Sequence, residues 1–460
     1  MDSTVNRSEE PCQLILYTLA AVRQFLNKNV KPTVLLIATS RWVPTARLAM
    51  ALSRAGFAVE ALCPSHHPIE KTGVVRETLP YCGLMGLTSI KSAICAAKPD
   101  IIIPCDDTAT RQLHLLHDRE KEEKEGFHIS SIIERSLGSS ESFSVVYERA
   151  RFMELALQEG VLVPRTEAVH TPEGLAECMA RLGIPLVLKA NGTTGGEGVR
   201  VAHDREEAER AFQALHRPPL LARAAKRALI DQDSTLVWPA VLRRQSLVNA
   251  QAFVQGREGT SVIACWKGTV LAALHFEVVE KRSFTGPATV LRLIESADMA
   301  TATDKMARRL NLSGIHGFDF MLENGSGDAY LIEINPRTTQ VGHLTLGPKR
   351  DIPAALYAVL SGNPVQPARK LTERDTFALF PHEWMRDPDS EYLGSAYHDV
   401  PWESPALVSA CLRTAQAQLG WQGYRKFLPG ASRGCSPRIV PIQANAATVN
   451  VSSRSSAEGD

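Results

Sequence analysis

The side chains with the clearest capacity for chemistry lie between residues 317 and 337. This stretch reads Gly317-Phe-Asp319-Phe-Met-Leu-Glu323, Asn-Gly-Ser-Gly-Asp, and Ala329-Tyr-Leu-Ile-Glu333-Ile-Asn335-Pro-Arg337. Two runs that alternate with period two flank a glycine-containing turn, which predicts an antiparallel hairpin. With 324–328 as the loop, residue 323 faces 329 and Asp319 faces Glu333. The predicted core-facing residues are Phe318, Phe320, Tyr330, Ile332 and Ile334.

The other side of this hairpin carries Asp319, Glu333 and Asn335. Two carboxylates directly opposed across strands destabilise a sheet unless a cation lies between them. Carboxylate and amide oxygens are hard ligands, which suit Mg²⁺ and argue against zinc. A solvated sheet face is the alternative, but Met321 and Leu331 would share it, so we favour a metal site. Arg337 follows at once and could reach a transferred phosphoryl group or a substrate carboxylate.

A second group of residues is rich in glycine and follows a predicted strand. Lys189 ends the strand, and Gly192, Gly195, Gly196 and Gly198 come within the next nine residues. Glycines let successive backbone N–H groups converge on an anion, and a lysine adds a point charge for a phosphate. The spacing is not that of a P-loop. A flexible hairpin turn is the alternative, but four glycines are excessive for one, so we favour a loop that covers phosphates.

Regular elements must hold these groups in place. Residues 34–37 predict a buried strand, a helix opens at Pro44 and ends at Gly56, and residues 57–62 form the next strand. This strand–helix–strand unit implies parallel strands, and residues 100–104 supply a third. Asp106 and Asp107 follow that strand, where open α/β sheets place ligand contacts. We nevertheless favour a capping or turn role for them, and the dinucleotide fingerprint G-x-G-x-x-G is missing.

Most of the remaining predicted elements follow residue 140. We predict helices at 13–28, 147–159 and 172–182, and a helix capped by Asp204 with Glu207. Strands are predicted at 186–189, 199–202, 251–254, 261–266 and 269–275, the last two joined by a Lys267-Gly268 turn. The charged stretch 117–125 is interpreted as an exposed link between domains.

These motifs, in this order, resemble the ATP-grasp superfamily over residues 140–362, in the carboxylate–amine ligase type. The preceding unit resembles the domain that precedes ATP-grasp in biotin carboxylase. The resemblance implies an α/β N-terminal domain with a Rossmann-like parallel sheet, followed by an α+β ATP-grasp fold of two subdomains. The expected divisions are 1–30 (helical segment), 31–125 (Rossmann-like domain), 140–215 and 216–362 (ATP-grasp subdomains), 363–430 (C-terminal extension) and 431–460 (disordered tail).

Residue by residue, the resemblance implies an ATP site with two Mg²⁺ ions, which Mn²⁺ could replace. Lys189 would hold phosphates under the 192–198 loop, and Asp319, Glu333 and Asn335 would bind metal. Arg337 matches the arginine of the E-x-N-x-R motif. Residues 251–256, with Gln251, Phe253 and Val254, match the hinge strand beside adenine, and Glu258 matches the ribose-side acid. Two positions depart from the superfamily: Arg149 replaces the upstream phosphate-binding lysine, and Ala252 the hinge glutamate.

Composition narrows the class of partner. The 460 residues carry 51 basic and 50 acidic side chains, a net charge of +1, so a nucleic acid is not an expected partner. No window reaches the roughly 18 apolar residues of a membrane span, and the N-terminus lacks a secretory signal. Nine cysteines without a C-x-x-C motif indicate reduced thiols in a cytoplasmic protein.

The expected activity is ATP-dependent joining of a small carboxylate, such as an amino acid, to an amine through an acyl phosphate. A phosphotransferase that stops after phosphorylation and a non-catalytic ATP sensor are the alternatives. A homodimer is compatible with either. His275, His316 and His343 are interpreted as structural, whereas Arg282 and Arg292 line the acceptor pocket or are plain surface charges. The extension after 363 closes over the acceptor side or only packs against the core.

Overall fold

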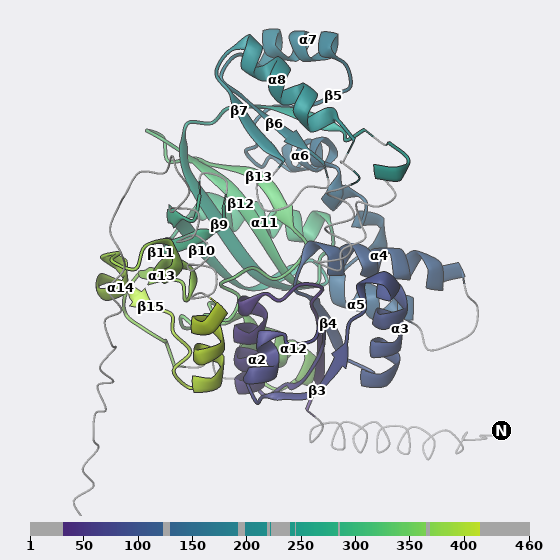
Figure 1. Cartoon of the computed structure of the whole chain (residues 1–460), viewed down its shortest axis with the longest axis vertical. Helices are drawn as coiled ribbons and strands as arrows, with labels where there is room; N and C mark the ends of the chain where they lie inside the picture. The colour runs from purple at the N-terminus through teal and green to yellow at the C-terminus, as the bar shows by residue number, and fades with distance from the viewer. Residues whose placement is uncertain are drawn as a thin grey trace, which may run out of the picture. The chain divides into compact units, whose positions relative to one another are not determined.

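The structure, a computed structural model, describes residues 31–122, 129–191, 198–218, 221, 240–243, 245–283, 286–364 and 369–414 (Figure 1). Three predictions lie outside these residues: the helix at 13–28, the glycines at 192, 195 and 196, and the disordered tail. None of the helices in the described ranges is both long enough and apolar enough to span a bilayer.

The first domain is built on a four-stranded parallel sheet of order β3-β2-β1-β4. Its elements are β1 (Thr33–Ile37), α2 (Val43–Ala55), β2 (Ala58–Cys63), β3 (Val75–Pro80), α3 (Gly86–Ala97), β4 (Ile101–Pro104), α4 (Asp107–Glu122) and α5 (Ile129–Leu137). The predicted strand–helix–strand unit is confirmed: Pro44 lies in the first turn of α2, and Gly56 ends it with a φ of 116°. Sequence analysis did not predict β3, an edge strand with exposed residues at its centre.

The predicted link at 117–125 is wrong over the residues that the structure describes. Helix α4 continues through Glu122. His117 is only 2% exposed, and Phe143 packs edge-on against its ring. The high charge of this stretch reflects the solvent side of a helix whose other side is buried.

The second domain begins with a four-stranded antiparallel sheet of order β5-β8-β6-β7. Its elements are α6 (Arg149–Gln158), β5 (Thr166–Val169), α7 (Pro172–Leu182), β6 (Leu186–Ala190), β7 (Val199–Ala202), α8 (Arg205–His216) and β8 (Val248–Ala252). Apolar residues of α7 and α8 cluster with Leu188 and Ala250, so both helices cover one face of the sheet. The predicted cap of α8 is confirmed, because Glu207 N donates to Asp204 Oδ1 over 2.7 Å.

A seven-stranded sheet follows, with the order β13-β12-β9-β10-β11-β14-β15. Its strands are β9 (Gly256–Trp266), β10 (Thr269–Lys281), β11 (Ala288–Leu293), β12 (Gly314–Glu323), β13 (Ala329–Asn335), β14 (Thr376–Ala378) and β15 (Tyr397–His398). Helix α11 (Ala297–Arg309) packs on the face that carries Ile263. Helix α12 (Ile352–Ser361) packs on the opposite face, which carries Val262.

The β12–β13 hairpin has the predicted pairing at one end and a β-bulge at the other. Asp319 lies opposite Glu333 as expected, but the register then shifts, so that Phe320 pairs with Leu331 and Leu322 with Ala329. Residue 323 therefore does not face 329. The extra residue in β13 is Ile332, which turns the side chains beyond it to the other face.

The bulge corrects the predicted core of the hairpin. Ala329 and Leu331 are buried with Phe318, whereas Tyr330 and Ile332 are only half-buried. The prediction of Tyr330 and Ile332 as core residues is therefore wrong. Because Leu331 leaves the face of Asp319, that face is more polar than strict alternation implied.

The segment from 369 to 414 completes the sheet rather than standing apart from it. Strand β14 pairs with β11, and Phe377 is fully buried, although Trp402 remains 61% exposed. A buried cluster ties the segment to earlier parts of the chain: Asp399 accepts hydrogen bonds from Arg47 in α2 and, over 2.7 Å, bonds to His343 Nε2. We call Arg47, His343 and Asp399 the Asp399 cluster.

Candidate active site

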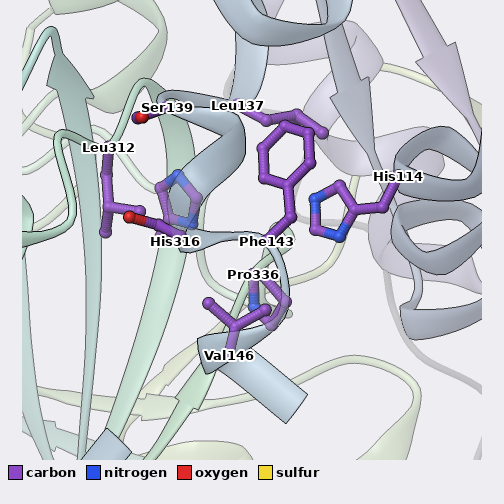
Figure 2. Close-up of a pocket in the computed structure, with 9 residues that line it drawn as sticks. His114, Leu137, Ser139, Phe143, Val146, Leu312, His316 and Pro336 are labelled. Atoms are coloured by element: carbon purple, nitrogen blue, oxygen red, sulfur yellow. The ribbon is translucent and has the colours of Figure 1, made fainter. Parts of the chain in front are cut away.

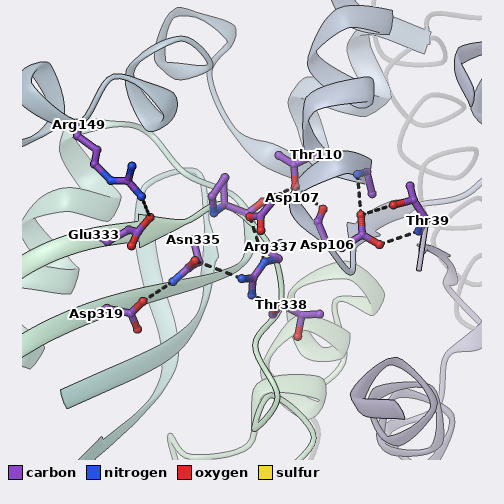
Figure 3. Close-up of polar contacts among 12 residues, drawn as sticks. Thr39, Asp106, Asp107, Thr110, Arg149, Asp319, Glu333, Asn335, Arg337 and Thr338 are labelled. Carbon is purple, nitrogen blue, oxygen red and sulfur yellow. Dashed lines mark hydrogen bonds and ion pairs between the residues drawn. The ribbon is translucent and has the colours of Figure 1, made fainter. Parts of the chain in front are cut away.

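Strands β12 and β13 bring the three predicted metal ligands together (Figure 3). Asp319 Oδ2 accepts a hydrogen bond of 2.8 Å from Asn335 Nδ2, and its Oδ1 accepts one of 2.9 Å from Thr260 on β9. Thr339 packs closely over Gly317, which is in the same strand as Asp319, so a Cβ at 317 would lie 2.4 Å from the Thr339 methyl carbon. Burial and the neighbouring Glu333 charge raise the pKa of Asp319 to about 6.

Arg149, at the start of α6, contacts the second carboxylate. Its Nη2 lies 2.6 Å from Glu333 Oε1, and its Nη1 donates over 2.6 Å to the carbonyl of Ala190. Burial alone would raise the pKa of Glu333, but the charges of Arg149 and Lys189 outweigh it and hold that pKa below its usual value. The residue that replaces the superfamily lysine therefore pairs with Glu333, one of the predicted metal ligands.

Lys189 points from the other sheet toward the same group of charges. It is 5% exposed, and burial lowers the pKa of its ammonium to about 8, while Glu333, Asp319 and Glu258 oppose that shift. In register it lies opposite Asn249, and the adjacent Leu188–Ala250 pair packs against α7 and α8. The side chains at 189 and 249 thus lie on the sheet face away from α7 and α8.

Asn249 is a buried neighbour of Lys189 that sequence analysis did not single out. It is 1% exposed, and its Nδ2 donates to Asn191 Oδ1 over 2.8 Å. Within the described part of the chain its Oδ1 accepts no hydrogen bond, which is costly for a buried group. The unclear pattern of residues 216–247 had obscured where β8 begins.

The predicted adenine-side residues occupy the connection between the two sheets. β8 ends at Ala252 and β9 begins at Gly256, so residues 253–255 form the link. Phe253 is 38% exposed and Val254 is half-buried. Gln251 is buried and donates over 2.9 Å to Thr166 Oγ1, so its side chain is engaged within its own sheet.

Two further predicted residues border the same region. Glu258 on β9 accepts a hydrogen bond of 2.6 Å from Lys281 and keeps 43% of its side chain exposed. Gly198 is buried at the end of the glycine-rich loop, and its carbonyl accepts a hydrogen bond from Ala190 N. The other three glycines lie outside the described residues.

Arg337 extends the site to the first domain. Its Nη2 donates to Asn335 Oδ1 over 3.3 Å, and its Nε donates to Asp107 Oδ1 over 3.1 Å. Although burial opposes it, Asp107 raises the pKa of Arg337. The capping role predicted for Asp106 is confirmed, because its Oδ1 accepts from Ala109 N over 2.9 Å. Asp107 instead contacts a predicted active-site residue.

The three histidines and the two arginines named in the sequence analysis lie in different surroundings. Each of the three histidines makes an internal hydrogen bond of 2.7 Å, from His275 to Ser261, His316 to the Ser313 carbonyl, and His343 to Asp399. Register pairs Asp319 with Thr260, Thr260 with Phe276, and Phe276 with Leu293, which puts these four on one face. Arg292, next to Leu293, therefore lies on the opposite face from Asp319. Arg282 follows β10 directly.

A small pocket is lined in part by Pro336, the residue between Asn335 and Arg337 (Figure 2). Figure 2 shows the stacked rings of His114 and Phe143, whose centroids are 3.8 Å apart. The pocket is lined by His114, Leu137, Ser139, Ser142, Phe143, Val146, Leu312, His316 and Pro336. None of the predicted nucleotide or metal ligands is among them.

The grouped donors fit a divalent metal with oxygen ligands. Asp319 and Glu333 lie side by side in register, Asn335 contacts Asp319, and each can present a hard oxygen. Burial and, after it, the charge of Glu333 raise the pKa of Asp319, and a cation beside the two carboxylates would favour their charged forms. Lys189 and Arg149 add positive charge beside these oxygen donors.

The fold and this arrangement of residues are similar to those of ATP-grasp proteins with a preceding Rossmann-like domain. Residues 148–345 match the family model described as carbamoyl-phosphate synthase L chain, ATP binding domain. The chain is also 25% identical over 194 residues to the carbamoyl phosphate synthase large chain of Methanosarcina acetivorans, and 24% identical over 198 residues to that of Pyrococcus furiosus. Each match covers 42% of this chain but only 16% or 17% of the relative.

Solved structures share the fold over a longer span. N5-carboxyaminoimidazole synthase from Aspergillus clavatus, in complex with ADP and 5-aminoimidazole ribonucleotide, is 15% identical with a TM-score of 0.53, covering 75% of this chain and 80% of that one. Biotin carboxylase from Campylobacter jejuni is 15% identical with a TM-score of 0.51, covering 75% and 74%. The family match over residues 148–345 and the shared fold make the chain similar to ATP-grasp carboxylate–amine ligases.

Proposed function

We propose that the protein is an ATP-dependent carboxylate–amine ligase that works through an acyl phosphate. One observation carries the proposal: the cationic side chains Lys189 and Arg149 meet the oxygen donors Asp319, Glu333 and Asn335 between two sheets. Cations matched to phosphates beside oxygen ligands matched to Mg²⁺ are what phosphoryl transfer from ATP needs.

Each predicted residue then has a role. Lys189 and Arg149 bind phosphate oxygens under the loop 192–198, and the link at 253–255 lies along adenine with Glu258 on the ribose side. Asp319, Glu333 and Asn335 hold magnesium, which neutralises charge on the phosphates when bound. Two ions are expected, as the resemblance implies, and Mn²⁺ is an acceptable substitute.

The proposed reaction takes place in two steps. A carboxylate oxygen of the substrate attacks the γ-phosphorus, the bond to the β-phosphate oxygen breaks, and ADP leaves with that electron pair. An amine nitrogen then attacks the acyl carbon, inorganic phosphate leaves, and the nitrogen loses a proton. Arg337, next to Asn335, donates N–H groups to the transferred phosphoryl group and stabilises its charge as it moves.

The comparisons support ATP and magnesium more firmly than they support a substrate. The matched family model is an ATP-binding domain, and the biotin carboxylase domain of a 2-oxoglutarate carboxylase from Hydrogenobacter thermophilus, which shares the fold with a TM-score of 0.50, is a dimer bound to MgADP. The large chains that match are about six times longer than the matched region, so their activity is not carried over to this chain. For this chain we propose small carboxylates, amino acids first, together with an amine, a homodimer and a cytoplasmic location.

The test is release of ADP and phosphate from Mg-ATP against a panel of amino acids and other carboxylates, with and without pooled amines. Release that needs both an acid and an amine is the expected result and names the substrate class. Release with an acid alone would establish a phosphotransferase instead. ATP binding without release across the panel would favour the sensor.

A further inference from the structure

The first domain contacts the segment after β13 through the end of β4 and the first turn of α4. Three hydrogen bonds connect the β4–α4 turn to residues 336–338: Thr338 N to the Pro104 carbonyl (3.2 Å), Thr110 Oγ1 to the Pro336 carbonyl (2.9 Å) and Arg337 Nε to Asp107 Oδ1 (3.1 Å). Two of them fix the backbone on either side of Arg337, and the third fixes its side chain. The turn thus contacts the E-x-N-x-R motif where it leaves the sheet.

This turn is itself firmly held. Asp106 is the cap of α4, and it also accepts hydrogen bonds from Thr39 N (2.6 Å) and Thr39 Oγ1 (2.8 Å) in the loop after β1. Asp107 is the next residue and the first of a sixteen-residue helix. Its backbone therefore has little freedom, and its carboxylate is a fixed reference point for any group that binds it.

Asp107 and Asn335 hold the guanidinium of Arg337 between them. Nε donates to Asp107 and Nη2 to Asn335 Oδ1, while Trp42 presents its ring 5.9 Å from the guanidinium carbon. Among the described residues, Asp107 is the sole carboxylate to which this guanidinium donates a hydrogen bond. Figure 3 shows Arg337 lying between Asp107 on one side and Asn335 on the other.

We propose that Asp107 is a positioning residue: it holds the Arg337 guanidinium in register with Asn335, and so makes the first domain part of the phosphoryl-transfer site. The inference rests on the proposed function. Arg337 has several rotatable bonds, and each conformation that its guanidinium can sample away from Asn335 weakens contact with the γ-phosphoryl group. Asp107 removes those conformations before ATP binds.

A purely architectural ion pair is the competing explanation. Such a pair would hold the first domain against residues 336–338 without affecting how Arg337 meets a phosphoryl group. Removing it would lower the unfolding temperature but leave nucleotide selectivity unchanged. A measurement of selectivity therefore separates the two roles, and it needs no knowledge of the acceptor.

The experiment compares Mg-dependent binding of ADP with that of the imido analogue of ATP, which carries a γ-phosphoryl group. The ratio of the two dissociation constants is measured by calorimetry for wild type, Asp107→Ala, Arg337→Ala and the double variant. Asp107→Asn is nearly isosteric and serves if Asp107→Ala does not fold. Asp118→Asn, an exposed position on the same helix, is the matched control.

If Asp107 acts through Arg337, Arg337→Ala lowers the preference for the γ-phosphoryl analogue about tenfold and Asp107→Ala about three- to tenfold. The double variant then matches Arg337→Ala within about twofold, since coupled residues are not additive. Unchanged selectivity in Asp107→Ala, or multiplied effects in the double variant, would overturn this inference alone. A wild-type protein that binds neither nucleotide would overturn the proposed function and this inference with it.

Discussion

Two arginine–carboxylate contacts in this molecule look alike in chemistry and differ in access. In the Asp399 cluster the side chains of Arg47 and Asp399 are 8% and 3% exposed, and His343 seals the other side. In the candidate active site the side chains of Arg149 and Glu333 are 13% and 34% exposed. The Asp399 cluster joins three distant parts of the chain, whereas the Arg149–Glu333 contact leaves a carboxylate within reach of solvent.

The difference shows what a buried charge is used for. A sealed carboxylate whose hydrogen bonds all go to protein groups can only hold structure, because nothing else can reach it. A carboxylate paired with one arginine and left open on the other side can exchange that partner for a ligand. The predictions below test each half of this comparison.

The largest effect is expected where the sealed contact is broken. Asp399→Ala leaves Arg47 and His343 buried without their shared partner, which costs about 3–5 kcal/mol of stability. Urea unfolding measures it. Glu403→Ala, which removes a half-exposed contact to Arg54, is the control and changes stability by less than about 1 kcal/mol. Equal losses in the two variants would contradict the distinction between sealed and open contacts.

Breaking the open contact is expected to cost activity rather than stability. Glu333→Gln keeps the shape of the side chain but removes the charge proposed to hold magnesium, so turnover falls on the order of 10²–10³-fold. Its unfolding midpoint stays close to that of wild type. Glu323→Gln, at the other end of the same hairpin, is the matched control. Wild-type ADP release by Glu333→Gln would remove the metal assignment.

A buried histidine without a carboxylate partner sharpens the comparison from another side. Burial, together with the nearby His117 and His316, lowers the pKa of His114 to about 3. The unfolded chain binds a proton there near pH 6.5, so the neutral folded form is disfavoured as pH falls below 6.5. At pH 5 this costs about 2 kcal/mol. Between pH 7 and 5, wild type should lose about that much more stability in urea unfolding than His114→Gln; equal losses would refute the assignment.

The smallest predicted effect concerns the arginine at the open contact. Arg149→Met removes a phosphate contact and also frees Glu333 in the nucleotide-free protein. We expect ATP to bind about tenfold more weakly and Mg²⁺ without nucleotide to bind more tightly, both by calorimetry. Arg151→Met, an exposed neighbour on α6, should change neither. If both affinities fall together in Arg149→Met, Arg149 does not compete with metal for Glu333.

Local patterns predicted what depends on neighbours in sequence. Alternation and a glycine turn gave the β12–β13 hairpin and the Asp319–Glu333 pairing, and terminal glycines marked the ends of α2 and α7. The bulge at Ile332 was not predictable, because no residue type there requires it. Strand β3 was not predicted because its centre is exposed. The start of β8, which includes Asn249, was not predicted because the preceding sequence has no clear period.

Contacts between distant parts of the chain were the other limit. Asp107 and Arg337 are 230 residues apart, and nothing local to either indicates the pairing. Sequence analysis assigned Asp107 the same capping or turn role as its neighbour Asp106. The role of each became separable only when the structure showed which carboxylate points into the first domain and which points out of it.

The Asp399 cluster also bears on how the chain is made. Arg47 and Asp399 are separated by 352 residues, which at about 5–20 residues per second corresponds to roughly 20–70 s of translation. Throughout that interval the nascent first domain carries an arginine whose burial site is incomplete. On the ribosome, this domain therefore waits for the last strand pair of the large sheet before α2 can reach its final environment.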